Sequence, residues 1–114
     1  MSRMDNQIIN NIVNNRIEVI SLNALRPPSL ENIRSFLTMC DIVRTRKYRQ
    51  LSGFMLFKMN VRRISKQLIE ENINDDNNDI INNIVTDVLW RKISQQDKTN
   101  YALLAEHANL LLYQ

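Results

Sequence analysis

Apolar residues recur every three or four positions over most of this chain, which is the spacing of one face of an α-helix. The most regular stripe predicts a helix over about residues 52–71, because its steps of three and four residues alternate. That stripe consists of Phe54, Phe57, Val61, Ile64 and Leu68. The rest of the chain divides into segments before and after this helix.

Two helices are predicted in the N-terminal segment. Residues 8–20 form an apolar stripe behind Asp5, which is a favourable N-cap residue. Pro27-Pro28 ends the segment that precedes it, and Ser29 is placed to cap a second, short helix. The apolar positions are Ile8, Ile9, Ile12, Val13, Ile17 and Ile20 in the first helix, and Leu30, Ile33, Phe36, Leu37 and Cys40 in the second.

Two more helices are predicted in the C-terminal segment. The polar run 70–79 is expected to be a loop, and a helix should follow over about 79–92. Ser94, with Asp97 three residues later, is a variant of the capping box and should open the last helix. The apolar face of that helix holds Tyr101, Leu104, Ala105, Ala108, Leu111 and Leu112. We therefore expect an all-α fold.

Composition agrees with a single small helical domain. The chain has 114 residues, of which 44% are apolar, and only one Gly and two Pro, too few for a turn-rich β-sandwich. The lone Cys40 has no disulfide partner, which favours an intracellular location. No apolar run approaches the roughly 18 residues of a membrane span. We predict a helical extension over residues 1–43 and a functional domain over 44–114.

Positive charge is concentrated in the second of these regions. Residues 1–43 carry four basic and four acidic side chains, so the net charge of +3 belongs to residues 44–114. No acidic residue occurs between positions 44 and 66, and the apolar block 54–57 lies in the middle of this stretch. Its basic members are Arg44, Arg46, Lys47, Arg49, Lys58, Arg62, Arg63 and Lys66. We predict that this stretch is an extended basic arm up to Arg49 and then a helix. Its charge suits a surface that binds a polyanion.

Three motifs occur in order along residues 46–112. The first reads Ser52-Gly53-Phe54-Met55-Leu56-Phe57, follows the basic arm and is itself followed by Arg62-Arg63. The second is Trp90-Arg91 at the end of the next helix, and the third, which opens the last helix, consists of Ser94, Gln95-Gln96-Asp97-Lys98, Tyr101 and Ala105. This order resembles an HMG box. In that family the first helix follows a short basic strand, begins with a motif like Asn-Ala-Phe-Met-Leu-Phe and carries an Arg-Arg pair two turns later, the second helix ends in Trp and a basic residue, and the third opens with Ser, acidic or amide residues, Lys, Tyr and Ala.

The chain departs from the family pattern at several positions. Gln50 stands where the arm usually has Pro, Ser52 where a base-reading Asn is usual, and Gly53 where Ala is usual. The loop after the first helix is longer, residues 82–89 match the common Ile-Ser-Lys pattern less closely, and no basic extension follows the third helix. The fold that the resemblance implies is an L-shaped three-helix box with a basic N-terminal arm.

The resemblance also implies roles for individual residues. Met55 would intercalate between base pairs from the minor groove of double-stranded DNA, and Phe54 would support the unstacked base. Ser52 would contact a base edge, while phosphates would be bound by Arg44, Arg46, Lys47, Arg49, Lys58, Arg62, Arg63 and Lys66. Phe57, Trp90 and Tyr101 would form the structural core.

Three functions remain open at this point. The first is a sequence-specific, DNA-bending transcription regulator in the nucleus, similar to the fungal mating-type regulators. The second is an architectural chromatin protein, in which Ile80 or Ile81 would supply a second wedge. The third is a helical protein-interaction module that uses the stripes at residues 8–20 and 104–112. Residues 1–43 are expected to fold back onto the box or to recruit a protein partner.

Other chemistry has little support in the sequence. There is no Gly-rich nucleotide loop or nucleophile with a nearby His, so we predict no enzyme and no cofactor. His107 is isolated, and Cys40 is expected to be a small buried hydrophobic residue. Asp75, Asp76 and Asp79 lack the Gly and the terminal Glu of a calcium loop, so we predict no metal site. A homeodomain is disfavoured because its last helix should be basic, and here that helix has only Lys98.

Overall fold

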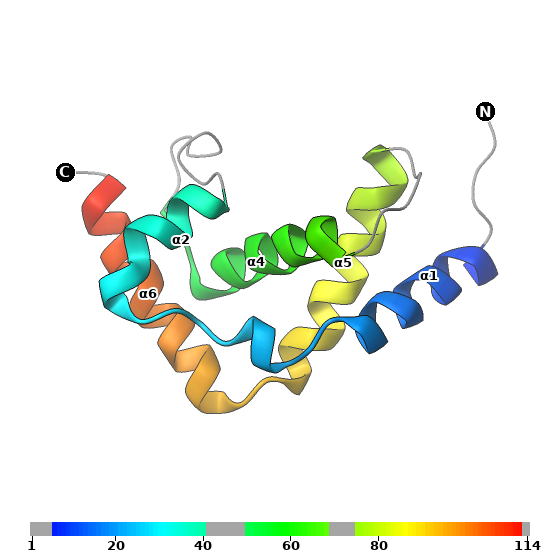
Figure 1. The fold of residues 1–114 in the computed structure, drawn as a ribbon, viewed down its shortest axis with the longest axis horizontal. Coiled ribbons are helices and arrows are strands. Elements are labelled where there is room, and N and C mark those ends of the chain that lie inside the picture. The colour runs from blue at the N-terminus through cyan, green and yellow to red at the C-terminus, as the bar shows by residue number, and fades with distance from the viewer. Residues whose placement is uncertain (1–5, 41–49, 69–74, 113–114) are drawn as a thin grey trace.

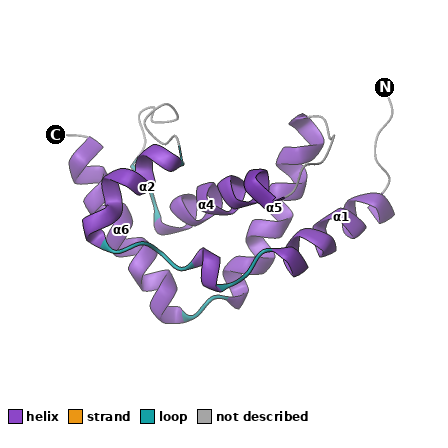
Figure 2. Cartoon of the chain, in the orientation of Figure 1, coloured by secondary structure: helices purple, strands orange, loops and turns teal. Residues whose placement is uncertain are grey.

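The computed structural model describes residues 6–40, 50–68 and 75–112, which form helices and connecting loops without any strand (Figures 1 and 2). The α-helices within these residues are α1 Asn6–Val19, α2 Ile33–Met39, α4 Gly53–Leu68, α5 Asp75–Lys92 and α6 Gln95–Leu112. Short 3₁₀ turns occur at Asn23–Leu25 (η1) and Leu30–Asn32 (η2). The predicted all-α class is confirmed.

Helix α4 is the centre of the fold. It packs against both α5 and α6, whereas α5 and α6 make few direct contacts with each other. Figure 1 shows the reason: α5 and α6 leave the corner at residues 93–94 in different directions, and α4 lies between them. The fully buried side chains at this junction come from all three helices and include Leu56, Phe57, Val61, Ile81, Val85, Leu89, Tyr101 and Leu104.

The N-terminal segment folds back along the rest of the chain. Helix α1 packs on α5, η1 on α4 and α2 on α6. Its apolar side chains belong to the same hydrophobic core as those of α4, α5 and α6, and the buried ones are Val13, Ile20, Leu25, Ile33, Phe36 and Leu37. The predicted domain boundary at residues 43/44 lies outside the described residues, and the parts on either side of it share one core.

The predicted helices agree with the structure except at some ends. Residues 75–79, expected to be loop, are the first residues of α5, so a helix replaces the loop in which a calcium site was considered. In this helical turn Asn78 and Asp79 have partners on α1 and α4, which local sequence does not reveal. Ser29 precedes η2, but its hydroxyl accepts a hydrogen bond from the Asn32 side chain rather than capping a backbone N–H. Asp5 lies outside the described residues.

Helix α6 begins as its sequence predicts. The Ser94 hydroxyl accepts a hydrogen bond from the backbone N–H of Asp97 at 3.0 Å, which is the N-cap interaction. Along the helix, Tyr101, Leu104 and Ala108 are buried on one face. The face predicted from the apolar spacing is therefore the face that enters the core.

The start of α4 is held closely against α6. The Ser52 hydroxyl accepts a hydrogen bond from the Met55 N–H at 3.2 Å and caps the helix. A Cβ atom on Gly53 would lie only 2.8 Å from the backbone nitrogen of Ala102, so only glycine fits this crossing without a shift of backbone. Just before the helix, the Asn109 side chain accepts from the Leu51 N–H at 2.7 Å and donates to the Leu51 carbonyl at 3.0 Å.

Candidate nucleic-acid interface

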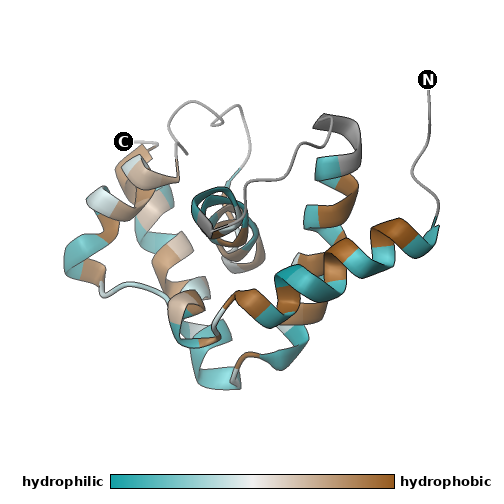
Figure 3. Cartoon of the chain, turned by 45° about the vertical axis from the view of Figure 1, so that its right-hand side comes forward, coloured by the Kyte–Doolittle hydropathy of each residue, from teal (hydrophilic) through white to brown (hydrophobic). Residues whose placement is uncertain are grey.

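The outer face of α4 is basic. Lys58, Arg62 and Lys66 are exposed and follow one another at steps of four residues, so they share one face. Met55 precedes Lys58 by three residues and lies at the N-terminal end of the same strip. No Asp or Glu occurs within Gly53–Leu68. Figure 3, which shows α4 almost end-on, has hydrophilic residues on its upper side. We call Lys58, Arg62 and Lys66 the α4 basic face, with Met55 at its N-terminal end.

The two predicted wedge residues are half-buried. The Phe54 ring packs edge-on against Trp90 with ring centroids 5.4 Å apart. Met55 packs against the edge of the hydrophobic core and keeps part of its surface in solvent. Both side chains therefore lie at the boundary between the core and the α4 basic face, where a partner can reach them.

An aromatic cluster supports this end of α4. The ring centroids of Phe57 and Trp90 are 5.0 Å apart, and those of Phe57 and Tyr101 are 5.4 Å apart in an edge-to-face arrangement. Phe57 and Tyr101 are fully buried, whereas Trp90 is half-buried. Because the three rings come from α4, α5 and α6, their packing fixes how the three helices meet.

Lys98 on α6 also contacts this cluster, and no role is predicted for it from the sequence. Its ammonium nitrogen lies 5.8 Å from the centroid of the Trp90 ring, within cation–π range. Since Trp90 also contacts Phe54, Lys98 adds a positive charge near the predicted wedge. The sequence feature that points to Lys98 is its position in the motif from Ser94 to Tyr101 at the start of the last helix.

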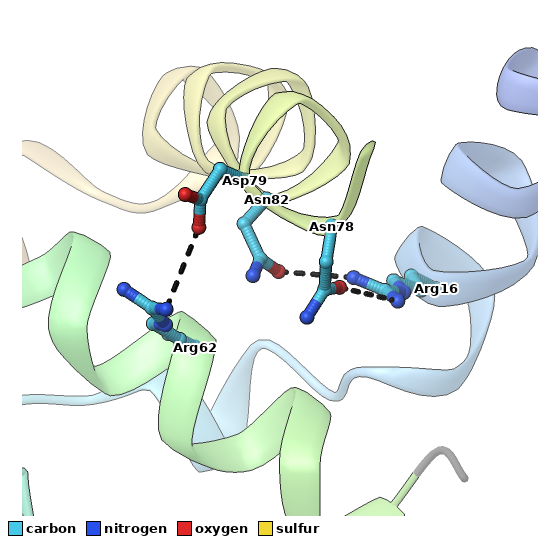
Figure 4. Close-up of polar contacts among 5 residues, drawn as sticks. All are labelled: Arg16, Arg62, Asn78, Asp79 and Asn82. Atoms are coloured by element: carbon cyan, nitrogen blue, oxygen red, sulfur yellow. Dashed lines mark hydrogen bonds and ion pairs between the residues drawn. The ribbon is translucent and has the colours of Figure 1, made fainter. Parts of the chain in front are cut away.

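Arg62 forms an ion pair with α5. Its Nη2 atom lies 3.4 Å from Oδ1 of Asp79 (Figure 4), and the side chains are 52% and 60% exposed. An exposed pair of this kind contributes about 0–1 kcal/mol. The guanidinium can therefore exchange Asp79 for a phosphate at little cost. A small depression beside the pair is lined by Lys58, Arg62, Asp79, Asn82 and Asn83.

Arg63 is attached to the interior by a chain of hydrogen bonds. Its Nε and Nη2 atoms donate to Oδ1 of Asn60 at 3.2 and 2.8 Å. Asn60 in turn donates to the Tyr101 hydroxyl at 3.1 Å, and that hydroxyl donates to the backbone carbonyl of Leu25. Burial raises the pKa of Tyr101 to about 12, although the bond from Asn60 acts in the opposite direction. The Tyr101 hydroxyl is therefore protonated at neutral pH.

A basic depression of about 440 Å³ lies between the end of α2 and α4. It is lined by Met39, Cys40, Met59, Arg62, Arg63, Lys66 and Gln67. Burial raises the pKa of the Cys40 thiol, and the nearby Arg63 lowers it by a smaller amount, so the thiol is neutral at pH 7. The ionised side chains of the lining are then all positive.

The structure thus brings together Ser52, Phe54, Met55, Lys58, Arg62, Arg63 and Lys66 on or beside one helix face. The other four predicted phosphate ligands, Arg44, Arg46, Lys47 and Arg49, lie outside the described residues. Of the two suggested second-wedge residues on α5, Ile80 is 48% exposed and Ile81 is fully buried. Ile81 therefore cannot be a wedge.

Within the described ranges, no three His, Cys, Asp or Glu side chains come together as a metal site. None of the described helices has the length and hydrophobicity needed to cross a membrane. No protein-family model, curated protein or solved structure matches this chain.

Proposed function

We propose that this chain is a nuclear transcription regulator of the HMG-box kind, which binds double-stranded DNA from the minor groove and bends it. The observation that supports this most is the α4 basic face, an acid-free helix surface with Met55 at its N-terminal end. Positive charge supplies affinity for phosphates, and a partly exposed apolar side chain beside it can enter a base step. Minor-groove proteins that bend DNA by inserting a wedge use this combination.

The finer fold that we propose is an L-shaped three-helix box formed by α4, α5 and α6. Its support is the divergence of α5 and α6 from residues 93–94, together with the aromatic cluster at their junction with α4.

A salt titration with duplex DNA tests the proposal. The logarithm of the binding constant should fall linearly with the logarithm of the salt concentration, by about 0.9 per phosphate neutralised. Replacing both Lys58 and Lys66 with Ala should make this slope shallower by about two. The matched control replaces Arg26 and Arg34, which are exposed in the N-terminal segment, and removes the same charge. Equal effects of the two double variants would contradict a role for the α4 basic face.

Ile80 favours a second candidate, the architectural chromatin protein, because an exposed isoleucine on α5 is available as a further wedge. Selection from random duplexes separates the two: a regulator returns a defined motif, and an architectural protein returns none. The third hypothesis, a protein-interaction module, stays a prediction. The helix faces that motivated it pack largely within the chain's own core.

A further inference from the structure

We infer that Asn60 and Tyr101 position Arg63 to bind a backbone phosphate of DNA in the basic depression between α2 and α4. This inference rests on the proposed function and adds two buried residues that do not themselves touch DNA. It also connects the phosphate site to the N-terminal segment, because the hydrogen-bond chain ends on the carbonyl of Leu25.

The first step of the argument is the geometry of the guanidinium. A free arginine side chain loses up to about 2 kcal/mol of conformational entropy when it is ordered. Here two of its nitrogen atoms bind the same oxygen of Asn60, and a third lies 3.5 Å from Oε1 of Gln67. Arg63 is therefore ordered before any ligand arrives, so that entropy is not lost on binding.

The second step is the rigidity of the anchor. Asn60 is 1% exposed, and both ends of its amide are used, since the oxygen accepts from Arg63 and the nitrogen donates to Tyr101. Tyr101 is fully buried and donates onward to the main chain of Leu25. The amide cannot rotate without breaking bonds in the interior, so the orientation of Arg63 is set by the core.

The third step is charge. The amide partners of Arg63 are neutral, unlike the Asp79 carboxylate beside Arg62, so its positive charge is not cancelled by them. Arg62 and Lys66 line the same depression. A guanidinium has five N–H groups in a fixed plane, of which three meet Asn60 and Gln67, and the neutral Cys40 thiol is a further partner of Arg63. A phosphate oxygen is the ligand that such a charged, planar donor set prefers.

A double-mutant cycle on duplex binding tests the inference, with every variant measured at a temperature at which circular dichroism shows it folded. Arg63→Ala should lower affinity and reduce the salt slope by about one. Asn60→Ala should weaken binding, yet add less than about twofold once Arg63 is already Ala. The control cycle combines Asn60→Ala with Arg62→Ala instead. In that background Asn60→Ala should weaken duplex binding as much as it does in the wild type. Tyr101→Phe in the same cycle replaces Asn60→Ala if that variant does not fold.

A second readout is independent of DNA. The Nε–H signal of Arg63 in an NMR spectrum should report an ordered side chain in the wild type and a mobile one in Asn60→Ala. A purely structural Asn60 would lower the melting temperature without changing the salt slope, and its effect would be the same in the Arg63→Ala and Arg62→Ala backgrounds. That result overturns the inference alone. A wild type whose binding to duplex DNA shows no salt dependence overturns the proposed function as well.

A competition experiment tests the nature of the ligand. Displacement of the duplex by poly-glutamate of equal charge at equal concentration would assign the depression to an acidic protein instead.

Discussion

The guanidinium of Arg16 donates a hydrogen bond to the side-chain oxygen of Asn82 at 3.0 Å and so joins α1 to α5 across 66 residues of sequence (Figure 4). A second bond of 3.0 Å runs to Asn78. Arg16 is only 4% exposed, and a buried charge requires such partners. The N-terminal segment is therefore attached by a specific polar contact as well as by apolar packing.

Replacing Arg16 with Met should destabilise the fold. Met keeps an unbranched apolar stem, shorter than that of Arg, but removes the donors, which leaves the buried oxygen of Asn82 without its partner. We expect the free energy of unfolding to fall by about 1.5–3 kcal/mol, the usual worth of a hydrogen bond to a charged group. Urea denaturation measures this change. Arg26→Met is the matched control because Arg26 is exposed, and equal midpoints for the two variants would refute the role of Arg16.

Gly53→Ala should also destabilise the protein, although Gly→Ala in a helix ordinarily stabilises by about 0.4–1 kcal/mol. The added Cβ would lie 2.8 Å from the nitrogen of Ala102 and 3.0 Å from the carbonyl carbon of Tyr101, both main-chain atoms. Moving α4 away from α6 should cost about 1–3 kcal/mol, as in other overpacked sites. Thermal unfolding measures the sign, and a raised melting temperature would show that the two helices are not this close.

Tyr101 should make the protein lose stability in alkali. Burial raises its pKa from 10.0 to about 12, so the unfolded chain releases the proton at a lower pH than the folded one. The stabilisation is complete below pH 10 and is lost as the pH rises through 12. The difference corresponds to about 2–3 kcal/mol.

Urea unfolding at several pH values between 8 and 12 measures this effect as the difference between wild type and Tyr101→Phe. The variant is less stable at neutral pH because it loses the bonds to Asn60 and Leu25, but its stability should fall less steeply above pH 10. Parallel pH profiles for the two proteins would show that Tyr101 ionises as an ordinary tyrosine.

Met55 and Arg62 should affect DNA in different ways. Met55→Ala removes the proposed wedge and should reduce the bend angle more than the affinity, whereas Arg62→Ala removes a phosphate contact and should do the reverse. Energy transfer between dyes at the two ends of a duplex measures the bend, and a gel shift measures the affinity. If both variants change bend and affinity in the same proportion, the assigned roles are incorrect.

The course of the helices was predictable because it depends on local spacing. The buried face of α4 is the one predicted from Phe57, Val61 and Ile64, and α6 begins at the predicted cap Ser94. The sequence predicts the start of α5 four residues too late. A sequence window shows only that residues 75–79 are polar. In the structure Asn78 contacts Arg16 and Asp79 contacts Arg62, and both partners are distant in the chain.

The α4 basic face was also predictable, since it needs only a helical period and the positions of Lys58, Arg62 and Lys66. The connection of Arg63 to the interior was not predictable. Asn60 and Tyr101 are 41 positions apart and Leu25 and Tyr101 are 76 apart, so no local pattern shows that they form one hydrogen-bond chain. Arg16 was likewise counted only as one of the charges that balance in residues 1–43.

By itself the sequence determined that this protein is helical, which faces of its helices are apolar, and where its positive charge is concentrated. These properties follow from the 3.6-residue period and from side-chain chemistry, which act within a few turns of helix. Tertiary structure alone decided that α1 and α2 share the core, that Arg16 is buried, and that Arg63 is held from the interior. Those outcomes depend on which surfaces meet when the whole chain packs, and that is a property of distant residues acting together.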